Sequence, residues 1–192
     1  MLLKFEQSQF GCEHQVADLE CLFSACFRAS ENTILVSGGN EPLYLPALSN
    51  AEVHKIISTK DYFSSALHEV SHWCIAGVER RKLLDYGYWY EPDGRNEQRQ
   101  GLFESVEVKP QALEWIFSLV CNVRFRLSVD NVAQPELKPS IDFMANIVAQ
   151  ARAFADFGLP PRAALFCDAL LAFYWPGGFE LKAQSFEQAM LL

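Results

Sequence analysis

Two histidines and a glutamate stand close together in the sequence, in the run His68-Glu69-Val70-Ser71-His72. Imidazoles are common ligands of zinc and iron, and a spacing of four residues places two of them on one side of a helix, one turn apart. A five-residue pattern of this kind also arises by chance on a helix whose polar face carries two unremarkable histidines. The first chemical hypothesis is therefore a metal site on a helix.

A catalytic metal needs a third protein ligand in addition to two imidazoles. The zinc-protease pattern that supplies a third histidine has a glycine three residues after the second one, where this chain has Ile75, and no histidine follows downstream. His14 and His54 lie upstream and could join the site only through the tertiary fold. A carboxylate is therefore the expected third ligand.

The acidic candidates lie in the segment GLFESVEVKPQALEW, as Glu104, Glu107 and Glu114. If this segment is helical from about residue 105, Glu107 and Glu114 lie on one polar stripe opposite a hydrophobic stripe. The same stripe is typical of a solvated helix face. We select Glu107 because a valine precedes and follows it at the expected helix entrance, where the alternation favours a partly buried backbone. Glu104 and Glu114 stay as alternatives.

Two histidines and one carboxylate suit two different metals. With zinc, an open position holds a water molecule and Glu69 is its general base, as in a metallopeptidase. With Fe(II), the three ligands form a facial triad that leaves positions for dioxygen and substrate. The ligand spacing does not separate these two chemistries.

Hydrophobic periodicity predicts the elements that must position these residues. On the expected motif helix, Leu67, Val70 and Cys74 share one side, and His68 and His72 share another. This helix is expected to begin near residues 58–61, where hydroxyl and carboxylate side chains can cap it. Further helices are predicted at 13–29, beyond Pro110, at 140–157 and at 161–175; strands at 32–39, 42–47 and 54–59, with a weaker one at 123–129. The fold class is therefore α+β, a single domain over residues 1–192 with helices packed on a small mixed sheet.

Composition limits the remaining function classes. The formal net charge of −8 disfavours direct binding to nucleic acid, and no run of about 18 apolar residues is present to span a membrane. The first residues lack the apolar core of a signal peptide, and the six cysteines form no C-x-x-C pair. We therefore expect a cytoplasmic protein with reduced thiols.

The segment HEVSHWCIAGVERRKLLDYGYWYEPDGRNEQRQ, followed by FESVEVKPQALEWIFS, resembles the bacterial elongation factor P hydroxylase family, and the resemblance extends over nearly the full chain. It implies hydroxylation of the elongation factor P lysine that already carries a β-lysyl group, with Fe(II), dioxygen and an undetermined further co-substrate. The metal ligands carried over are His68, His72 and Glu107. The resemblance also implies a fold like that of a metal-dependent ribosomal-RNA maturation endonuclease. The H-x-D/E…H order of the common oxygenase barrel is missing, so no 2-oxoglutarate site is transferred.

The physical character of the chain suits such a substrate. A β-lysyl-lysine is positively charged, and an acidic protein attracts it over long range. Trp73, Tyr88, Trp89 and Tyr90 are expected to wall a pocket around an alkyl-ammonium chain, although Trp73 and some of the tyrosines would fit a core equally well. In a hydroxylase, Glu69 orients an imidazole or a water molecule. A zinc metallopeptidase and a non-catalytic domain remain the alternatives.

Overall fold

The computed structural model describes residues 14–84, 95–130 and 138–191 of the 192-residue chain. In these ranges the main elements are α1 (Val16–Phe27), β1 (Thr33–Gly39), β2 (Leu43–Leu45), β3 (His54–Thr59), α2 (Phe63–Ile75), α3 (Glu97–Val120), α4 (Ile141–Phe157) and α5 (Pro161–Tyr174), with short 3-10 turns at Arg80–Lys82, Ala183–Ser185 and Gln188–Leu191. The α+β class and the small mixed sheet predicted from the sequence are confirmed.

The sheet has the strand order β1-β3-β2. Strand β3 pairs in parallel with β1, where Leu35 lies opposite Ile56, and antiparallel with β2, where Leu43 lies opposite Ile57. Leu35 and Ile56 are buried and their neighbours along each strand are more exposed, as expected for a sheet with one covered face. Helix α1 packs on β1 and α2 packs on β3, so these two helices provide the cover.

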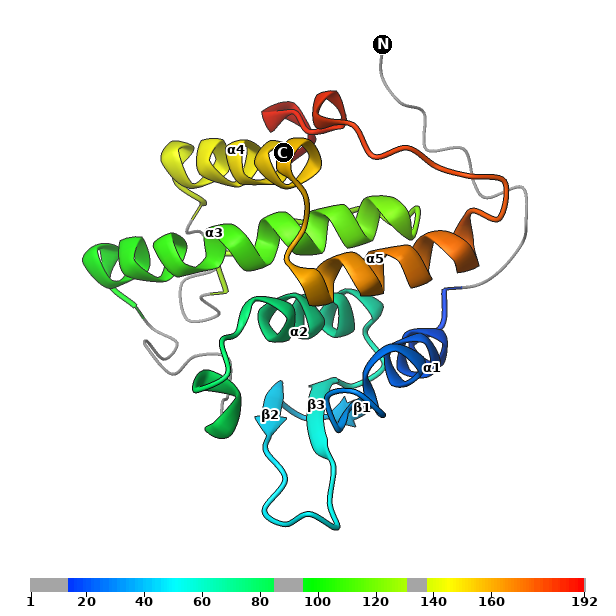
Figure 1. Cartoon of the computed structure of the whole chain (residues 1–192). Helices are drawn as coiled ribbons and strands as arrows, with labels where there is room; N and C mark the ends of the chain where they lie inside the picture. The colour runs from blue at the N-terminus through cyan, green and yellow to red at the C-terminus, as the bar shows by residue number, and fades with distance from the viewer. Residues whose placement is uncertain (1–13, 85–94, 131–137, 192) are drawn as a thin grey trace.

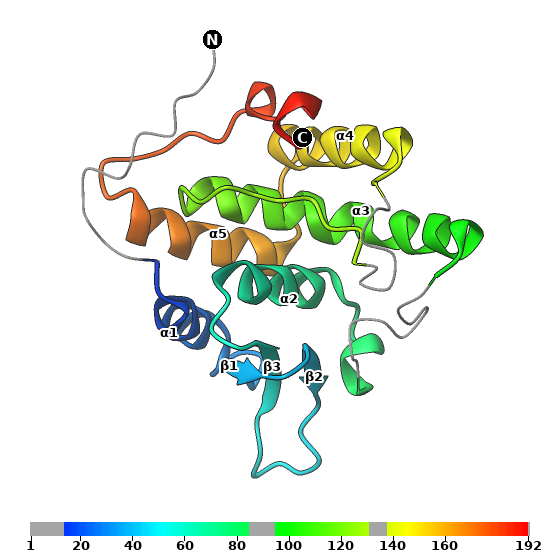
Figure 2. The same cartoon turned by 180° about the vertical axis from the view of Figure 1, so that it is seen from behind.

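The helices form further layers above the sheet. Both views of the chain show α2 between the sheet and the pair α3 and α5, with α4 on the far side of α3 (Figures 1 and 2). One hydrophobic core runs through these layers, and buried aromatic side chains from α1, α2, α3 and α5 meet in it, among them Phe23, Trp73, Phe117 and Phe166. Helix α2 thus has neighbours on both sides, which fixes its rotation about its own axis.

Helix α3 is longer than the sequence predicted. It begins at Glu97, where the Asn96 side chain accepts a hydrogen bond from the Arg99 backbone N–H at 3.0 Å, and it continues through Pro110. A proline inside a helix removes one backbone hydrogen bond and costs about 3 kcal/mol. Pro110 itself and most residues from 111 to 121 are buried, and the hydrophobic burial of this half of the helix offsets the cost.

Two smaller expectations were also wrong. No hydroxyl or carboxylate caps α2, whose N-cap is Tyr62; instead the Thr59 N–H donates to the Ser65 Oγ at 3.0 Å. Residues 123–129 do not form a strand with any described residue. They run back along α3, where Phe125 stacks on Trp115 with ring centroids 5.7 Å apart.

Five cysteines fall within the described ranges, and all five are free thiols. Within the part of the chain that is described, no helix combines the length and apolar character needed to cross a lipid bilayer.

Candidate metal centre

Helix α2 presents the two histidines of the motif to α3. Its opposite side is buried in the core, where Leu67 and Val70 are fully covered and Cys74 is 3% exposed. The His68 and His72 side chains are each 25% exposed. The amphipathic pattern of α2 therefore divides its surface into a face that holds the helix in place and a face that carries the candidate metal ligands.

Helix α2 is held at its C-terminal end by Arg162 of α5. The guanidinium group donates hydrogen bonds to the carbonyl oxygens of Trp73 and Cys74, at 3.0 and 3.2 Å, and to that of Ala76. A cation at this end of a helix also interacts favourably with the helix dipole. The same guanidinium lies 4.8 Å from the centre of the Trp73 ring, and Arg81 lies 5.5 Å from it. These contacts fix the axial position of α2, and with it the position of His72.

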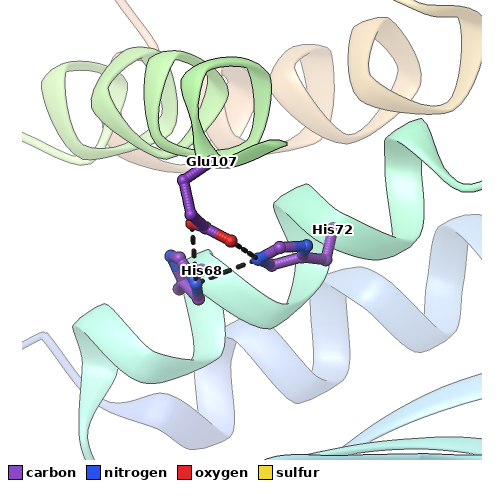
Figure 3. A group of neighbouring side chains, drawn as sticks. All are labelled: His68, His72 and Glu107. Carbon is purple, nitrogen blue, oxygen red and sulfur yellow. Dashed lines mark hydrogen bonds and ion pairs between the residues drawn. The ribbon is translucent and has the colours of Figure 1, made fainter. Parts of the chain in front are cut away.

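The three ligand candidates selected from the sequence come together between α2 and α3 (Figure 3). The Nε2 atoms of His68 and His72 lie 3.0 Å apart. The Glu107 carboxylate lies 3.2 Å from His72 Nε2 through Oε1 and 3.7 Å from His68 Nε2 through Oε2. Among the described residues, these three form a group whose ligand atoms all lie within 4.8 Å of one another.

This spacing fits a single metal ion. Two ligand atoms each about 2.1 Å from a metal and at right angles to each other lie about 3 Å apart. The two Nε2 atoms, 3.0 Å apart, match that value, and one Glu107 oxygen lies 3.2 Å from His72 while the other lies 3.7 Å from His68. Two imidazole nitrogens and a carboxylate oxygen are also suitable donors for Zn²⁺ and for Fe²⁺.

Glu114 orients the His68 imidazole. Its Oε2 lies 2.8 Å from His68 Nδ1, which donates its proton to the carboxylate and leaves Nε2 to face Glu107 and His72. A carboxylate on the far nitrogen of a metal-binding histidine fixes the ring and raises its basicity. Glu114 was considered as a ligand, but the structure places it behind His68.

The acidic surroundings also change the charge of His68 in the metal-free protein. Burial alone would lower the pKa of this imidazole. The hydrogen bond to Glu114 and the negative charges of Glu114, Glu107 and Glu69 outweigh burial and raise the pKa to about 10. At neutral pH the metal-free imidazole is therefore protonated on both nitrogens, and a metal must displace the proton on Nε2.

Glu104 has a different role from Glu107 and Glu114. Its carboxylate accepts hydrogen bonds from the Ser140 backbone N–H at 3.1 Å and from the Ser140 hydroxyl at 2.5 Å. Ser140 is the N-cap of α4, where its Oγ accepts from the Phe143 N–H at 3.0 Å. The Glu104 carboxylate thus fastens α4 to α3 and does not face the histidines.

The polar stripe of α3 is not a solvated face, as it would be in an ordinary surface helix. Glu107, Gln111 and Glu114 are 2%, 1% and 6% exposed. The Gln111 side-chain amide donates to Glu107 Oε2 at 3.3 Å and to the Ser128 carbonyl oxygen at 2.8 Å. The stripe is covered by α2 on one side and by the segment after α3 on the other, which explains its burial.

A cavity of about 640 Å³ opens onto the three ligand candidates. Carboxylates of Asp61, Glu69 and Asp130 lie on its walls, and two cations, Arg124 and Arg126, lie on the segment after α3. The cavity is large enough for an extended amino-acid side chain, so the candidate ligands are accessible to a substrate.

The other residues selected from the sequence lie outside this cavity or outside the described ranges. Trp73 is 3% exposed and packs against Phe23 and Phe27 in the core, with ring centroids 5.0 and 4.8 Å from its own. It does not line the cavity, because its side chain leaves α2 on the core side, and we do not propose it as a substrate contact. Tyr88, Trp89 and Tyr90 lie outside the described residues.

Neither of the upstream histidines joins the site. His14 Nε2 bonds to the Cys121 carbonyl oxygen at 2.6 Å, and His54 Nδ1 accepts from the Ala47 N–H at 2.8 Å.

Sequence reasoning missed the roles of Glu114 and of the two arginines. Glu114 follows Glu107 by seven residues, which is two helical turns, so both lie on the same face; this spacing indicated a second carboxylate that could reach the histidine helix. In VRFRLSV, Arg124 and Arg126 alternate with buried or half-buried residues, which places both on one side of an extended segment.

Comparisons with known proteins agree with these observations. A model of the family described as elongation factor P hydroxylase matches residues 22–186. An elongation factor P lysine hydroxylase of Haemophilus influenzae is 48% identical over 164 residues, which cover 84% of this chain and 90% of that protein. The match includes α2, α3 and the segment that follows α3, and therefore every residue of the candidate site.

Proposed function

The chain belongs to the elongation factor P hydroxylase family, and from this premise we propose that it hydroxylates the β-lysylated lysine of elongation factor P at an iron(II) centre. The observation that carries the proposal is the convergence of two imidazole nitrogens and one carboxylate oxygen within 4.8 Å, at a cavity. Two histidines and one carboxylate with open positions are typical of non-haem iron(II) oxygenases. We assign His68, His72 and Glu107 as the metal ligands.

Iron(II) held by these ligands would supply dioxygen activation. One oxygen atom would enter a C–H bond of the substrate, and the other would leave as water with two electrons and two protons from an external reductant. The residues of the chain have the tasks of binding and orientation. Glu114 holds the proton on His68 Nδ1 at 2.8 Å, which keeps the lone pair of Nε2 directed at the site. Gln111 donates to Glu107 and restricts the carboxylate to one orientation.

The cavity walls would bind the cationic side chain. The carboxylates of Asp61 and Glu69 lie on the walls, where they attract the amino groups of a β-lysyl-lysine. The net charge of −8 strengthens this attraction at long range. Glu69 is adjacent to His68 in the chain and is proposed to orient a substrate amine or a water molecule. Tyr88, Trp89 and Tyr90 remain predicted walls of the same pocket.

The ligand geometry would also suit zinc, with Glu69 as the general base of a metallopeptidase. Membership of a hydroxylase family supports the oxidative chemistry over the hydrolytic one. The cytoplasmic location expected from the sequence is consistent with a translation factor as substrate and stays a prediction, as does the likeness to a ribosomal-RNA maturation endonuclease.

Intact-mass measurement of elongation factor P tests the proposed function. β-Lysylated and unmodified elongation factor P are incubated with the protein and iron(II) plus a reductant, in air and without oxygen, and in parallel with zinc. We expect a gain of one oxygen atom only on the lysylated form, and only with iron in air. Cleavage of the substrate chain with zinc would establish the peptidase instead. A protein that binds neither metal would be a non-catalytic domain.

A further inference from the structure

We infer that residues 124–127 form a docking strip on which the acceptor protein pairs as an added β-strand, with acidic side chains of the acceptor meeting Arg124 and Arg126. The inference rests on the proposed function, because it concerns how a protein substrate would bind next to the metal centre. It adds a binding surface that recognises the backbone and charges beside the modified lysine.

The strip lies on the wall of the metal cavity. It belongs to the extended segment that leaves α3 and runs back along it (Figure 2). Arg124 and Arg126 are exposed and both line the cavity, whereas Phe125 between them is 6% exposed and stacks on Trp115. Side chains that alternate between two sides with a period of two are typical of a β-strand with one buried face. The strip thus has the form of a strand although it has no partner strand among the described residues.

The backbone hydrogen-bonding groups of the strip have no partner in the part of the chain that the structure describes. Within the described ranges, no residue forms a hydrogen bond with the backbone N–H or C=O groups of residues 124–127, and no carboxylate forms an ion pair with either arginine. Such a row of unpaired backbone groups can accept a further strand, and several peptide-binding domains use an exposed strand in this way. A buried strand face together with free backbone groups therefore indicates an edge prepared for pairing.

Both ends of the strip are held in place. On one side the Val123 N–H donates to the Ser118 carbonyl oxygen at 2.9 Å. On the other, the Ser128 N–H donates to Gln111 Oε1 at 3.1 Å, and the buried Arg95 donates to the Val129 carbonyl oxygen at 3.1 Å. A preformed strip loses little conformational entropy on binding, which favours its use as a docking site.

The charge of the strip defines the partner. Residues two apart on a strand lie about 6.6 Å apart on the same side, and so do their counterparts on a paired strand. The two arginines would therefore match carboxylates at alternate positions of the acceptor, and guanidinium groups bind carboxylates with two parallel hydrogen bonds. Asp61 and Glu69 lie on other walls of the cavity and favour the cationic side chain. The acceptor is thus expected to place the amines of its modified lysine in the cavity and the acidic residues beside that lysine on the strip.

Hydrogen–deuterium exchange on the wild-type protein tests the backbone pairing. The backbone amides of residues 124–127 should exchange rapidly in the free protein. Every second one of them, on the edge that faces the added strand, should exchange at least about tenfold more slowly when β-lysylated elongation factor P is present at saturation. No added protection of these amides at saturation would refute the docking strip. This measurement needs no variant and does not depend on turnover.

Steady-state kinetics test the charges. We expect the double variant Arg124→Ala with Arg126→Ala to raise the KM for lysylated elongation factor P about tenfold, since each exposed ion pair contributes about threefold, with kcat within about twofold of wild type. The matched control removes two exposed cations from a separate cavity, as Arg28→Ala with Lys55→Ala, and should leave KM unchanged. The melting temperatures of both variants verify that they are folded.

The outcomes are distinguishable. An unchanged KM in the arginine variant would overturn the inference, and so would an effect confined to the apparent KM of the reductant or of another small anionic co-substrate. If the wild-type protein adds no oxygen atom while the acceptor still protects residues 124–127, the proposed function fails and the docking strip stands. If oxygen is added without protection, the proposed function stands and the docking strip fails.

Discussion

Three glutamates of α3 differ in their contacts, and replacing each by glutamine separates their roles. Glu107 faces both histidines, Glu114 bonds to the far nitrogen of His68, and Glu104 bonds to Ser140. Each change removes one negative charge from the same helix and keeps the side-chain shape. The three variants therefore serve as controls for one another.

The expected magnitudes follow from these contacts. Glu114→Gln keeps an oxygen that can accept from His68 Nδ1 but loses its charge, so metal affinity should fall by about 10- to 100-fold, which is about 1.4 to 2.7 kcal/mol. Glu107→Gln removes a proposed ligand, and the loss of metal affinity should exceed about 100-fold. Glu104→Gln weakens the attachment of the α4 N-terminus by about 1 kcal/mol, a decrease in melting temperature of about 2–4 °C, with metal affinity unchanged.

The assay is an anaerobic titration with iron(II) in competition with a chelator, joined to thermal unfolding with and without the metal. If Glu104→Gln loses the metal while Glu107→Gln retains it, the third ligand is wrong and the reasoning from the structure fails. Equal losses in Glu107→Gln and Glu114→Gln would show that both carboxylates bind the metal directly.

Four further changes test other parts of the reasoning. His68→Ala or His72→Ala should abolish stoichiometric metal binding while circular dichroism stays that of a folded protein; retained metal would place the site elsewhere. Glu69→Gln should keep the metal and measurable hydroxylation of elongation factor P, whereas a peptidase would lose about 100-fold or more of its activity with its general base. Folding raises the pKa of His68 from its ordinary 6.5 to about 10, so the protonated imidazole stabilises the metal-free folded protein. This stabilisation should be fully present below pH 6.5 and should be lost as the pH rises toward 10. The difference in melting temperature between wild type and His68→Ala should therefore shrink over that range of pH. Trp73→Ala should lower the free energy of unfolding by about 3–5 kcal/mol in a urea titration, since this ring is 3% exposed and packs against two phenylalanines; a loss of substrate binding with unchanged stability would show that Trp73 is a pocket residue after all.

Sequence periodicity was enough to predict most elements of the fold. The strands at Thr33–Gly39 and His54–Thr59 and the helices at both ends of the chain lie within a few residues of their predicted positions, because each has a continuous hydrophobic pattern bounded by turn residues. The start of α3 was not predicted, because Pro110 indicates a helix boundary in a sequence, and only the tertiary structure shows that the helix tolerates it.

The candidate site likewise has one part that the sequence predicts and one part that only the tertiary structure determines. The i, i+4 spacing of His68 and His72 determines that their rings can meet, and it is a local property of one helix. The choice among the three glutamates depends on how α2 packs on α3 and on where α4 begins, which no local pattern contains. Glu104 and Glu107 both lie near the predicted helix entrance, and only the contact of Glu104 with Ser140 shows which of them is committed elsewhere.

The distribution of the candidate ligands over two helices has a consequence for the synthesis of the protein. Glu114 follows His68 by 46 residues, so a growing chain presents both histidines well before the carboxylates that complete and orient the site. Two imidazoles on an isolated helix hold iron only weakly, and the full ligand set exists only after α3 has packed on α2. Loading of the proposed iron(II) would thereby be coupled to completion of the fold, and an unfinished or misfolded chain would not carry a redox-active metal that could damage it.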